Sequence, residues 1–372
     1  MRANPLLHAG CVAAGLCLAV AAPAAAQDTL YRKGGGAIGQ PGQIEIIDLY
    51  LDKIEYRLKG VTKQTVDTSQ VASWEFGEPP KVFDDAETAF KERRFDDAAK
   101  FYAQAAGREH KQKWVVPLSL YGRGEALRLA EAYAQAVDAY KQYLDGYANH
   151  IRLAEANIGI GQCYLATRRH DLARRAFDVV AGGKYGEAHA ITGEIWKARI
   201  LEVEGKWAEA KAAYAQLEKR AGAQFKDEAV NAGVRKNLAA VQVAIGGKDD
   251  GGLSSLRSSL QSNLRDLTKA GNRPDLEAAV WSGIGETYYF AARPDWLEAL
   301  IAFCHVFVRY AEQDEVVPKA LYYGGCAYFY AADKIGKDPE SIDLARRRGF
   351  GLLGRLRNEY KNTDWARKPP PK

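Results

Sequence analysis

The chain has 372 residues, of which 47% are hydrophobic, and its formal net charge is +5. This length accommodates two ordinary domains or one extended array, and the hydrophobic content excludes a disordered protein. The mild basic charge is spread along the chain, which excludes the concentrated basic surface of proteins that bind nucleic acids.

The first 26 residues differ in composition from everything that follows. Arg2 gives a positive start, an apolar run covers Gly10 to Val20, and small residues follow Pro23 up to Ala26. This pattern predicts a signal peptide at residues 1–26, cleaved after Ala26, so we expect a periplasmic or secreted protein. Pro23 cuts the apolar run short of a membrane span, and no later segment is apolar enough to cross a bilayer.

Residues 27–78 read as a small β module. Short runs of alternating hydrophobicity begin at Ile44, Lys53, Thr62 and Val71, with glycine-containing turns between them. Four or five strands at this spacing predict a small antiparallel barrel or curled sheet of the SH3 or Sm type. About 50 residues are marginal for independent stability, so we expect this module to pack on the first helices.

Residues 79–366 show a helical pattern that repeats. In each copy a small residue is followed nine positions later by an aromatic residue or histidine, then by alanine three later and an aromatic residue four later still. Copies start at Ala86, Gly124, Gly161 and Ala198, which are 38, 37 and 37 residues apart. The small residues let two helices of a hairpin cross closely, and the aromatic residues fill the space between hairpins. Hairpins that each bury one face must stack, which produces a superhelix with a groove.

This repeat resembles the tetratricopeptide repeat. The first-helix pattern of that family is reproduced at its usual offsets by Trp281, Ile284, Gly285 and Tyr288. The resemblance implies a mainly α fold, a right-handed α-solenoid of about seven helical hairpins, with residues 367–372 as a flexible tail. A degenerate hairpin is expected between Ala229 and Leu264. The copies are longer than the family's usual unit, so a related helical array of longer period stays open.

In the tetratricopeptide family the first helix of each hairpin lines a groove that holds a partner. Carried over position by position, the resemblance implies a partner-binding groove of Tyr121, Glu125, Arg128, Gln162, Arg199, Glu202, Glu286, Tyr289, Tyr322 and Phe329. The middle of this set is charged and its C-terminal end is aromatic. Aromatic side chains with a polar tip are good interface anchors, so we expect a protein or peptide partner there.

The cysteines and histidines point to no metal or disulfide framework. Two of the five cysteines lie in the predicted signal peptide, and the remaining Cys163, Cys304 and Cys326 are odd in number. A single bond between Cys304 and Cys326 stays open. No two histidines lie three or four residues apart, so we expect no metal site and no cofactor.

The sequence contains no nucleophile elbow and no phosphate loop, so we expect no enzymatic activity. The resemblance implies an exported scaffold of the cell envelope that binds a protein or peptide and helps to assemble or organise an envelope complex. Two alternatives stay open. One is a carbohydrate-binding or enzyme-accessory protein that uses the β module or the tyrosine-rich C-terminal groove, and the other is a self-assembling structural protein.

Overall fold

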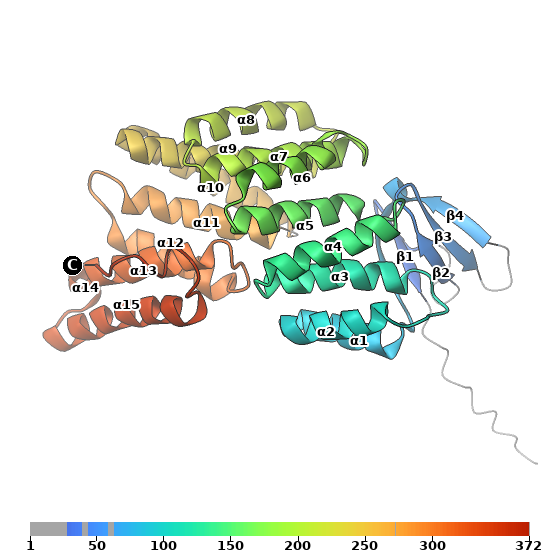
Figure 1. Cartoon of the computed structure of the whole chain (residues 1–372). Coiled ribbons are helices and arrows are strands. Elements are labelled where there is room, and N and C mark those ends of the chain that lie inside the picture. The colour runs from blue at the N-terminus through green and yellow to red at the C-terminus, as the bar shows by residue number, and fades with distance from the viewer. Residues whose placement is uncertain (1–27, 39–43, 59–62, 272, 372) are drawn as a thin grey trace, which may run out of the picture. The chain divides into compact units, whose positions relative to one another are not determined.

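The structure is a computed structural model that describes residues 28–38, 44–58, 63–271 and 273–371. Within these ranges the protein is mainly helical: five short strands are followed along the chain by fifteen helices (Figure 1). The chain divides into two compact units. Unit 1 holds the residues up to Ala130 together with Gln142–Arg152, and unit 2 holds Glu131–Lys141 and everything from Leu153 onward. The predicted signal peptide at residues 1–26 lies outside the described residues.

The strands of unit 1 form two antiparallel sheets, which agrees with the predicted small antiparallel module. The first sheet has the order β2 (Ile44–Leu49), β3 (Lys53–Leu58) and β4 (Lys63–Asp67), and the second pairs β1 (Thr29–Arg32) with β5 (Val71–Glu75). In β2, Ile44 and Ile46 are buried, and a shift of register against β3 then places Leu49 in the core as well. Closure into an SH3- or Sm-type barrel stays a prediction.

The helices of unit 1 are α1 (Lys81–Lys91), α2 (Phe95–Ala106) and α3 (Val115–Leu129), and α4 (Tyr133–Gly146) runs from unit 2 into unit 1. Aromatic rings join them to the β module. Phe76, which follows β5, stacks on Trp114 with ring centroids 3.5 Å apart, and Phe83 of α1 meets the same indole at 5.3 Å. Trp114 is only 1% exposed. The residue that follows β5 therefore packs in one aromatic cluster with the first helices of unit 1.

Unit 2 consists of helices that pack against their neighbours in sequence. Alternate helices also touch, so that α5 contacts α7, α7 contacts α9, α9 contacts α11 and α11 contacts α13. Among the described helices, none is both long and apolar enough to cross a bilayer. The helices are α5 (Leu153–Ala166), α6 (His170–Ala181), α7 (Glu187–Val203), α8 (Trp207–Ala221), α9 (Lys226–Gly247), α10 (Asp250–Ala270), α11 (Pro274–Tyr289), α12 (Trp296–Arg309), α13 (Val317–Tyr330), α14 (Ala332–Ile335) and α15 (Pro339–Glu359).

The small residues of the repeat lie directly against its aromatic rings. A Cβ atom on Gly285 would lie 2.7 Å from the ring of Phe303, in the second helix of the same hairpin, and Gly161 is placed in the same way. In unit 1, Gly122, two residues before the repeat position Gly124, also lies against a ring: its Cβ atom would lie 2.7 Å from Tyr102, in the preceding hairpin. Each aromatic residue thus needs a small partner, which explains why both recur with one spacing.

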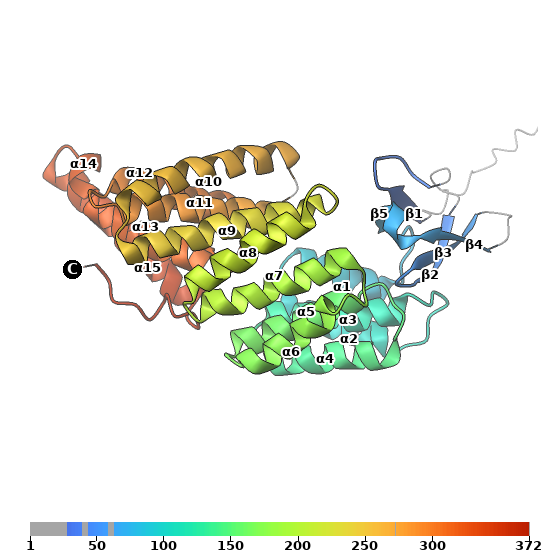
Figure 2. The same ribbon diagram turned by 90° about the horizontal axis from the view of Figure 1, so that it is seen from above.

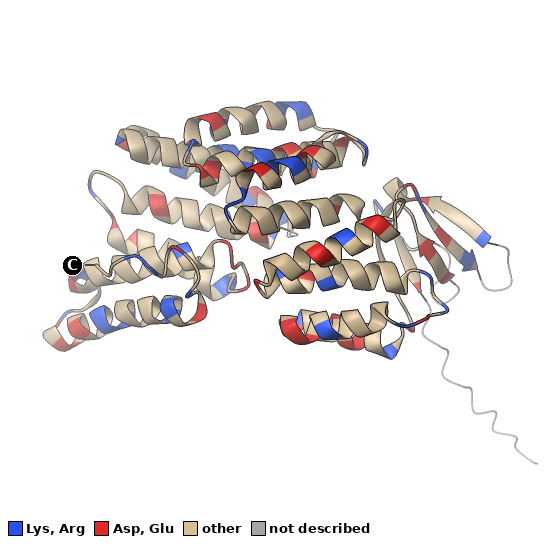
Figure 3. Cartoon of the chain, in the orientation of Figure 1, with Lys and Arg blue, Asp and Glu red and all other residues tan. Residues whose placement is uncertain are grey.

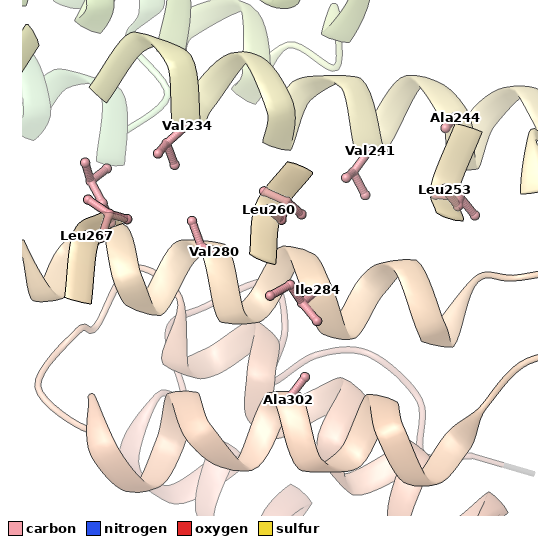
Figure 4. Packing of buried hydrophobic residues seen from close by; sticks show 10 residues of the cluster. Val234, Val241, Ala244, Leu253, Leu260, Leu267, Val280, Ile284 and Ala302 are labelled. Carbon is pink, nitrogen blue, oxygen red and sulfur yellow. The ribbon is translucent and has the colours of Figure 1, made fainter. Parts of the chain in front are cut away.

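The predicted degenerate hairpin is formed by α9 and α10. Its core follows a seven-residue spacing, with Val234 and Val241 on α9 and Leu253, Leu260 and Leu267 on α10. Figure 4 shows these side chains meeting Val280 and Ile284 of α11. A regular apolar stripe therefore holds this hairpin together where the repeat pattern is absent.

The turns between paired helices share an unusual backbone conformation. Arg93, Glu131 and Arg168 have φ angles of 59°, 60° and 58°, and Gly205 has 73° at the next equivalent position. In this left-handed region a residue with a Cβ costs about 1 kcal/mol relative to glycine. These turns recur with the spacing of the repeat, yet three of the four carry a charged side chain.

Candidate functional site

The structure divides the ten predicted groove residues between the two units. Tyr121, Glu125 and Arg128 lie on α3 of unit 1, and the other seven lie on α5, α7, α11 and α13 of unit 2. Gln162 is half-buried on α5. Figure 3 shows residues of both charge signs spread over the helices of the described chain.

The two predicted charged residues of α7 already have partners within the chain. Arg199 is 9% exposed and forms a bidentate ion pair with Glu315, in which Nη1 donates to Oε2 at 3.0 Å. Glu202, one turn further along α7, accepts a hydrogen bond from the Tyr214 hydroxyl at 2.7 Å. Although the Glu315 side chain is 58% exposed, the positive charges of Arg199 and Arg235 lower its pKa to about 2.

Glu286 on α11 is also satisfied internally. It is 4% exposed, and its carboxylate accepts hydrogen bonds from Lys319 Nζ at 2.9 Å and from Gln242 Nε2 at 3.0 Å. A buried carboxylate needs such partners, because an uncompensated charge in the interior is costly. These contacts join α9, α11 and α13, so the charge of Glu286 holds helices together.

The aromatic end of the predicted groove divides into two neighbourhoods. Tyr289 packs against Tyr323 with ring centroids 4.9 Å apart, and Tyr322 packs against the same ring at 5.3 Å. Phe329 instead contacts Phe350 of α15 at 5.7 Å. The prediction grouped three aromatic residues of this region, and the structure brings two of them, Tyr289 and Tyr322, into one cluster.

The C-terminal segment, residues 360–371, covers this cluster. The Trp365 ring lies 5.9 Å from Tyr322 and 5.3 Å from Tyr323, and Lys368 Nζ lies 3.8 Å from the centre of the Trp365 ring. The Tyr322 hydroxyl donates to the carbonyl oxygen of Pro369 at 3.1 Å. Burial lowers the pKa of the Lys368 ammonium group. Tyr322 thus holds this segment, which folds in consecutive turns, by a backbone hydrogen bond and by ring contacts.

The same segment is tied to turns that lie far away in the sequence. Asp364 accepts two hydrogen bonds from Arg168 Nη2, at 2.9 and 2.7 Å, and Asn362 donates to Glu131 at 2.7 Å. Arg168 and Glu131 are two of the residues with a left-handed backbone. Sequence reasoning missed these contacts, although Trp365 next to a basic and proline-rich end was a usable signal.

In unit 1 two of the three predicted residues, Tyr121 and Glu125, border a cavity of about 750 Å³. Glu125 pairs with Arg128 at 2.7 Å, and Arg152 lies over the rings of Trp74 and Tyr121, at 5.1 and 5.9 Å from their centres. Most of the cavity lining comes from β5, α1 and α3, and the first two were not part of the predicted groove. Sequence patterns alone could not show that β5 lies beside α1.

The three cysteines among the described residues are free thiols, so Cys304 and Cys326 are not joined. Cys326 is 2% exposed, and burial raises the pKa of its thiol. In the part of the chain that the structure describes, no group of three or more histidine, cysteine or acidic side chains is arranged to hold a metal ion.

Comparison with known proteins adds no family to this picture. No protein-family model matches the chain, and no curated protein is similar to it.

Proposed function

We propose that this protein is an exported scaffold of the tetratricopeptide type that binds a peptide segment of a partner protein in the cell envelope. The repeated pairing of small and aromatic residues supports the repeat class, as do the contacts between alternate helices of unit 2. Proteins built from such repeats use their first helices as a recognition surface.

The observation that carries the proposal is the seating of the C-terminal segment on α13. Tyr322 and Tyr323 contact a tryptophan ring, a lysine ammonium group and a backbone carbonyl of this segment, which are groups that a peptide ligand offers. The protein's own segment therefore acts as a model of the ligand, and a partner segment would compete with it for the same tyrosines.

The proposed binding surface is narrower than the groove implied by the repeat. Arg199 and Glu286 already have ion-pair partners within the chain, and they would need to lose these before contacting another molecule. We therefore assign binding to the cluster of Tyr289, Tyr322 and Tyr323, and we assign a structural role to the buried charges.

Site-specific crosslinking in the host cell tests this assignment. A photoreactive phenylalanine analogue at Tyr322 should capture a defined partner, and the same analogue at Val308, which is 70% exposed on α12, should not. Adding a synthetic peptide with the sequence of residues 361–372 should compete for the captured product. Equal capture at both positions, or capture unaffected by the peptide, would contradict the proposal.

Export is tested separately by cell fractionation. The mature chain should begin at Gln27 and should appear in the periplasm or the medium, because residues 1–26 have the composition of a signal peptide. A chain that keeps Met1 and stays in the cytoplasm would contradict this part of the proposal alone.

A further inference from the structure

The cavity of unit 1 differs from the tyrosine cluster in having no part of the described chain laid across it. It is lined on one side by Ala72 to Phe76, in and just after β5, and on the other by one face of α1 with Asp84, Glu87 and Phe90. Trp74, Phe76 and Phe90 are half-buried, so each still presents ring surface to the cavity. A cavity of about 750 Å³ with such walls has room for several side chains of a ligand.

The strand at the cavity's border has a free edge. Within the described residues β5 pairs only with β1, whose other side is joined to Ala37 and Ile38. Figure 2 shows β1 and β5 as a pair beside the three-stranded sheet. Ala72, Ser73 and Glu75 are exposed, so this edge is open to solvent. An unpaired strand edge offers a row of backbone donors and acceptors to an incoming strand.

The charges on the opposite wall favour a cation. Asp84 is exposed and Glu87 accepts a hydrogen bond from the Tyr102 hydroxyl at 2.5 Å, and within the described chain neither carboxylate forms an ion pair. Glu75, at the end of β5, likewise accepts from a hydroxyl, that of Tyr31, at 3.1 Å. Two basic residues also border the cavity: Lys91 at the end of α1, and Arg152, which already lies over two rings. The four acidic lining residues outnumber these two, so the net charge of the cavity wall is negative.

We propose that this cavity binds a second peptide, an extended segment of a partner protein that alternates apolar and basic residues. The peptide adds to the free edge of β5 through its backbone. On one face its apolar side chains pack against Trp74 and Phe76, and on the other face a lysine or arginine lies beside Asp84 and Glu87. Alternation is required because successive residues of a strand point to opposite sides. This site shares no residue with the tyrosine cluster of unit 2, so it goes beyond the function proposed above.

The test uses the full chain from Gln27 onward and three labelled octapeptides. The first alternates lysine and phenylalanine, the second alternates glutamate and phenylalanine, and the third is the lysine peptide with every second backbone nitrogen methylated. Fluorescence anisotropy should show binding of the first peptide only. Methylation removes backbone donors, so strand addition predicts that affinity falls by about tenfold or more.

Matched variants separate the cavity from general charge attraction. Asp84→Lys combined with Glu87→Gln should lower the affinity for the lysine peptide by about tenfold, because a repulsive charge replaces an attractive one. The amide oxygen of the introduced glutamine can still accept the hydrogen bond from the Tyr102 hydroxyl. The control, Asp145→Lys with Glu109→Gln, makes the same change of charge at exposed positions of unit 1 outside the cavity, and should change affinity less than about twofold. Circular dichroism checks that both variants are folded.

The outcomes are decisive in either direction. Loss of affinity in the cavity variant alone, together with loss on methylation, supports the proposal. Equal loss in both variants, unchanged binding of the methylated peptide, or no binding of the lysine peptide overturns it. A Tyr322→Ala variant should bind the lysine peptide normally, so failure of this site and failure of the tyrosine cluster can be told apart.

Discussion

The tyrosine cluster of unit 2 and the cavity of unit 1 both contain aromatic rings with carboxylates nearby. They differ in whether other parts of the chain cover the rings and pair with the carboxylates. In unit 2 the rings are covered by the C-terminal segment, and the nearby carboxylates of Glu286 and Glu315 are paired with Lys319 and Arg199. In unit 1 the rings border an open cavity, and Asp84 and Glu87 form no ion pair in the described chain. A charged residue at a groove position is therefore a binding candidate only where the chain has not already neutralised it.

The largest expected effect concerns pH and would sharpen the comparison of the units. His150 of unit 1 is 4% exposed, and burial together with the charge of Arg152 lowers its pKa from 6.5 to about 4. As the pH falls below 6.5, His150 takes up a proton in the unfolded chain but not in the folded chain. The free energy of unfolding therefore decreases until the pH reaches about 4. The total loss is about 3 kcal/mol.

Hydrogen exchange at pH 7 and at pH 4.5 measures this loss by region. Unit 1 should lose protection first, because Glu315 in unit 2 keeps its charge until the pH falls below its ordinary pKa and approaches 2. His305 of unit 2 also has a lowered pKa, but it is half-exposed and should contribute less. His150→Gln should remove the pH dependence of unit 1 in this range. If that variant lost protection between pH 7 and pH 4.5 as the natural chain does, the effect could not be assigned to His150.

The next effect contrasts a structural charge with an available one. Glu286→Ala leaves Lys319 and Gln242 without their acceptor, and should lower the free energy of unfolding by about 2 kcal/mol, less than for a fully buried pair because Lys319 is partly exposed. Asp84→Ala should change it by less than about 0.5 kcal/mol. Urea denaturation of both variants measures the difference. Equal effects would mean that the two carboxylates do not differ as the structure indicates.

A smaller effect is expected from uncovering the tyrosine cluster. Trp365→Ala should cost about 1 kcal/mol, because a half-buried indole loses its contacts with Tyr322 and Tyr323. Lys361→Ala, an exposed position of the same segment, is the matched control and should be neutral. The Trp365 variant should also bind the free 361–372 peptide more tightly. Thermal unfolding and anisotropy provide the two measurements, and weaker peptide binding would argue against competition.

The smallest effect comes from the left-handed turns. Lys248→Gly at the α9–α10 turn, where φ is 54°, should stabilise the protein by about 1 kcal/mol, because glycine relieves the steric cost of a Cβ. Arg168→Gly should gain less, about 0.5 kcal/mol, because it also removes the exposed ion pair with Asp364. A larger gain for Arg168→Gly than for Lys248→Gly would show that the ion pair does not stabilise the segment.

The sequence predicted those features that depend on local periodicity. The strands and the pairing of small residues with rings both follow from spacing, because a ring that packs on a small residue fixes the size of that residue. It could not predict which charges are free. Arg199 and Glu315 are 116 residues apart, and no pattern links them. The C-terminal segment has no periodicity either, so its seat on Tyr322 was missed.

The hydrogen bond between Asn362 and Glu131 spans 231 residues, and this span has a kinetic consequence. Closing so large a loop costs more chain entropy than any hairpin does, so the contact can form only after the intervening helices are in place. Docking of the C-terminal segment should therefore be the final event of folding. A chain that folds after export would therefore pass through a state with its tyrosine cluster still uncovered, and an envelope partner present at that moment would meet an empty surface.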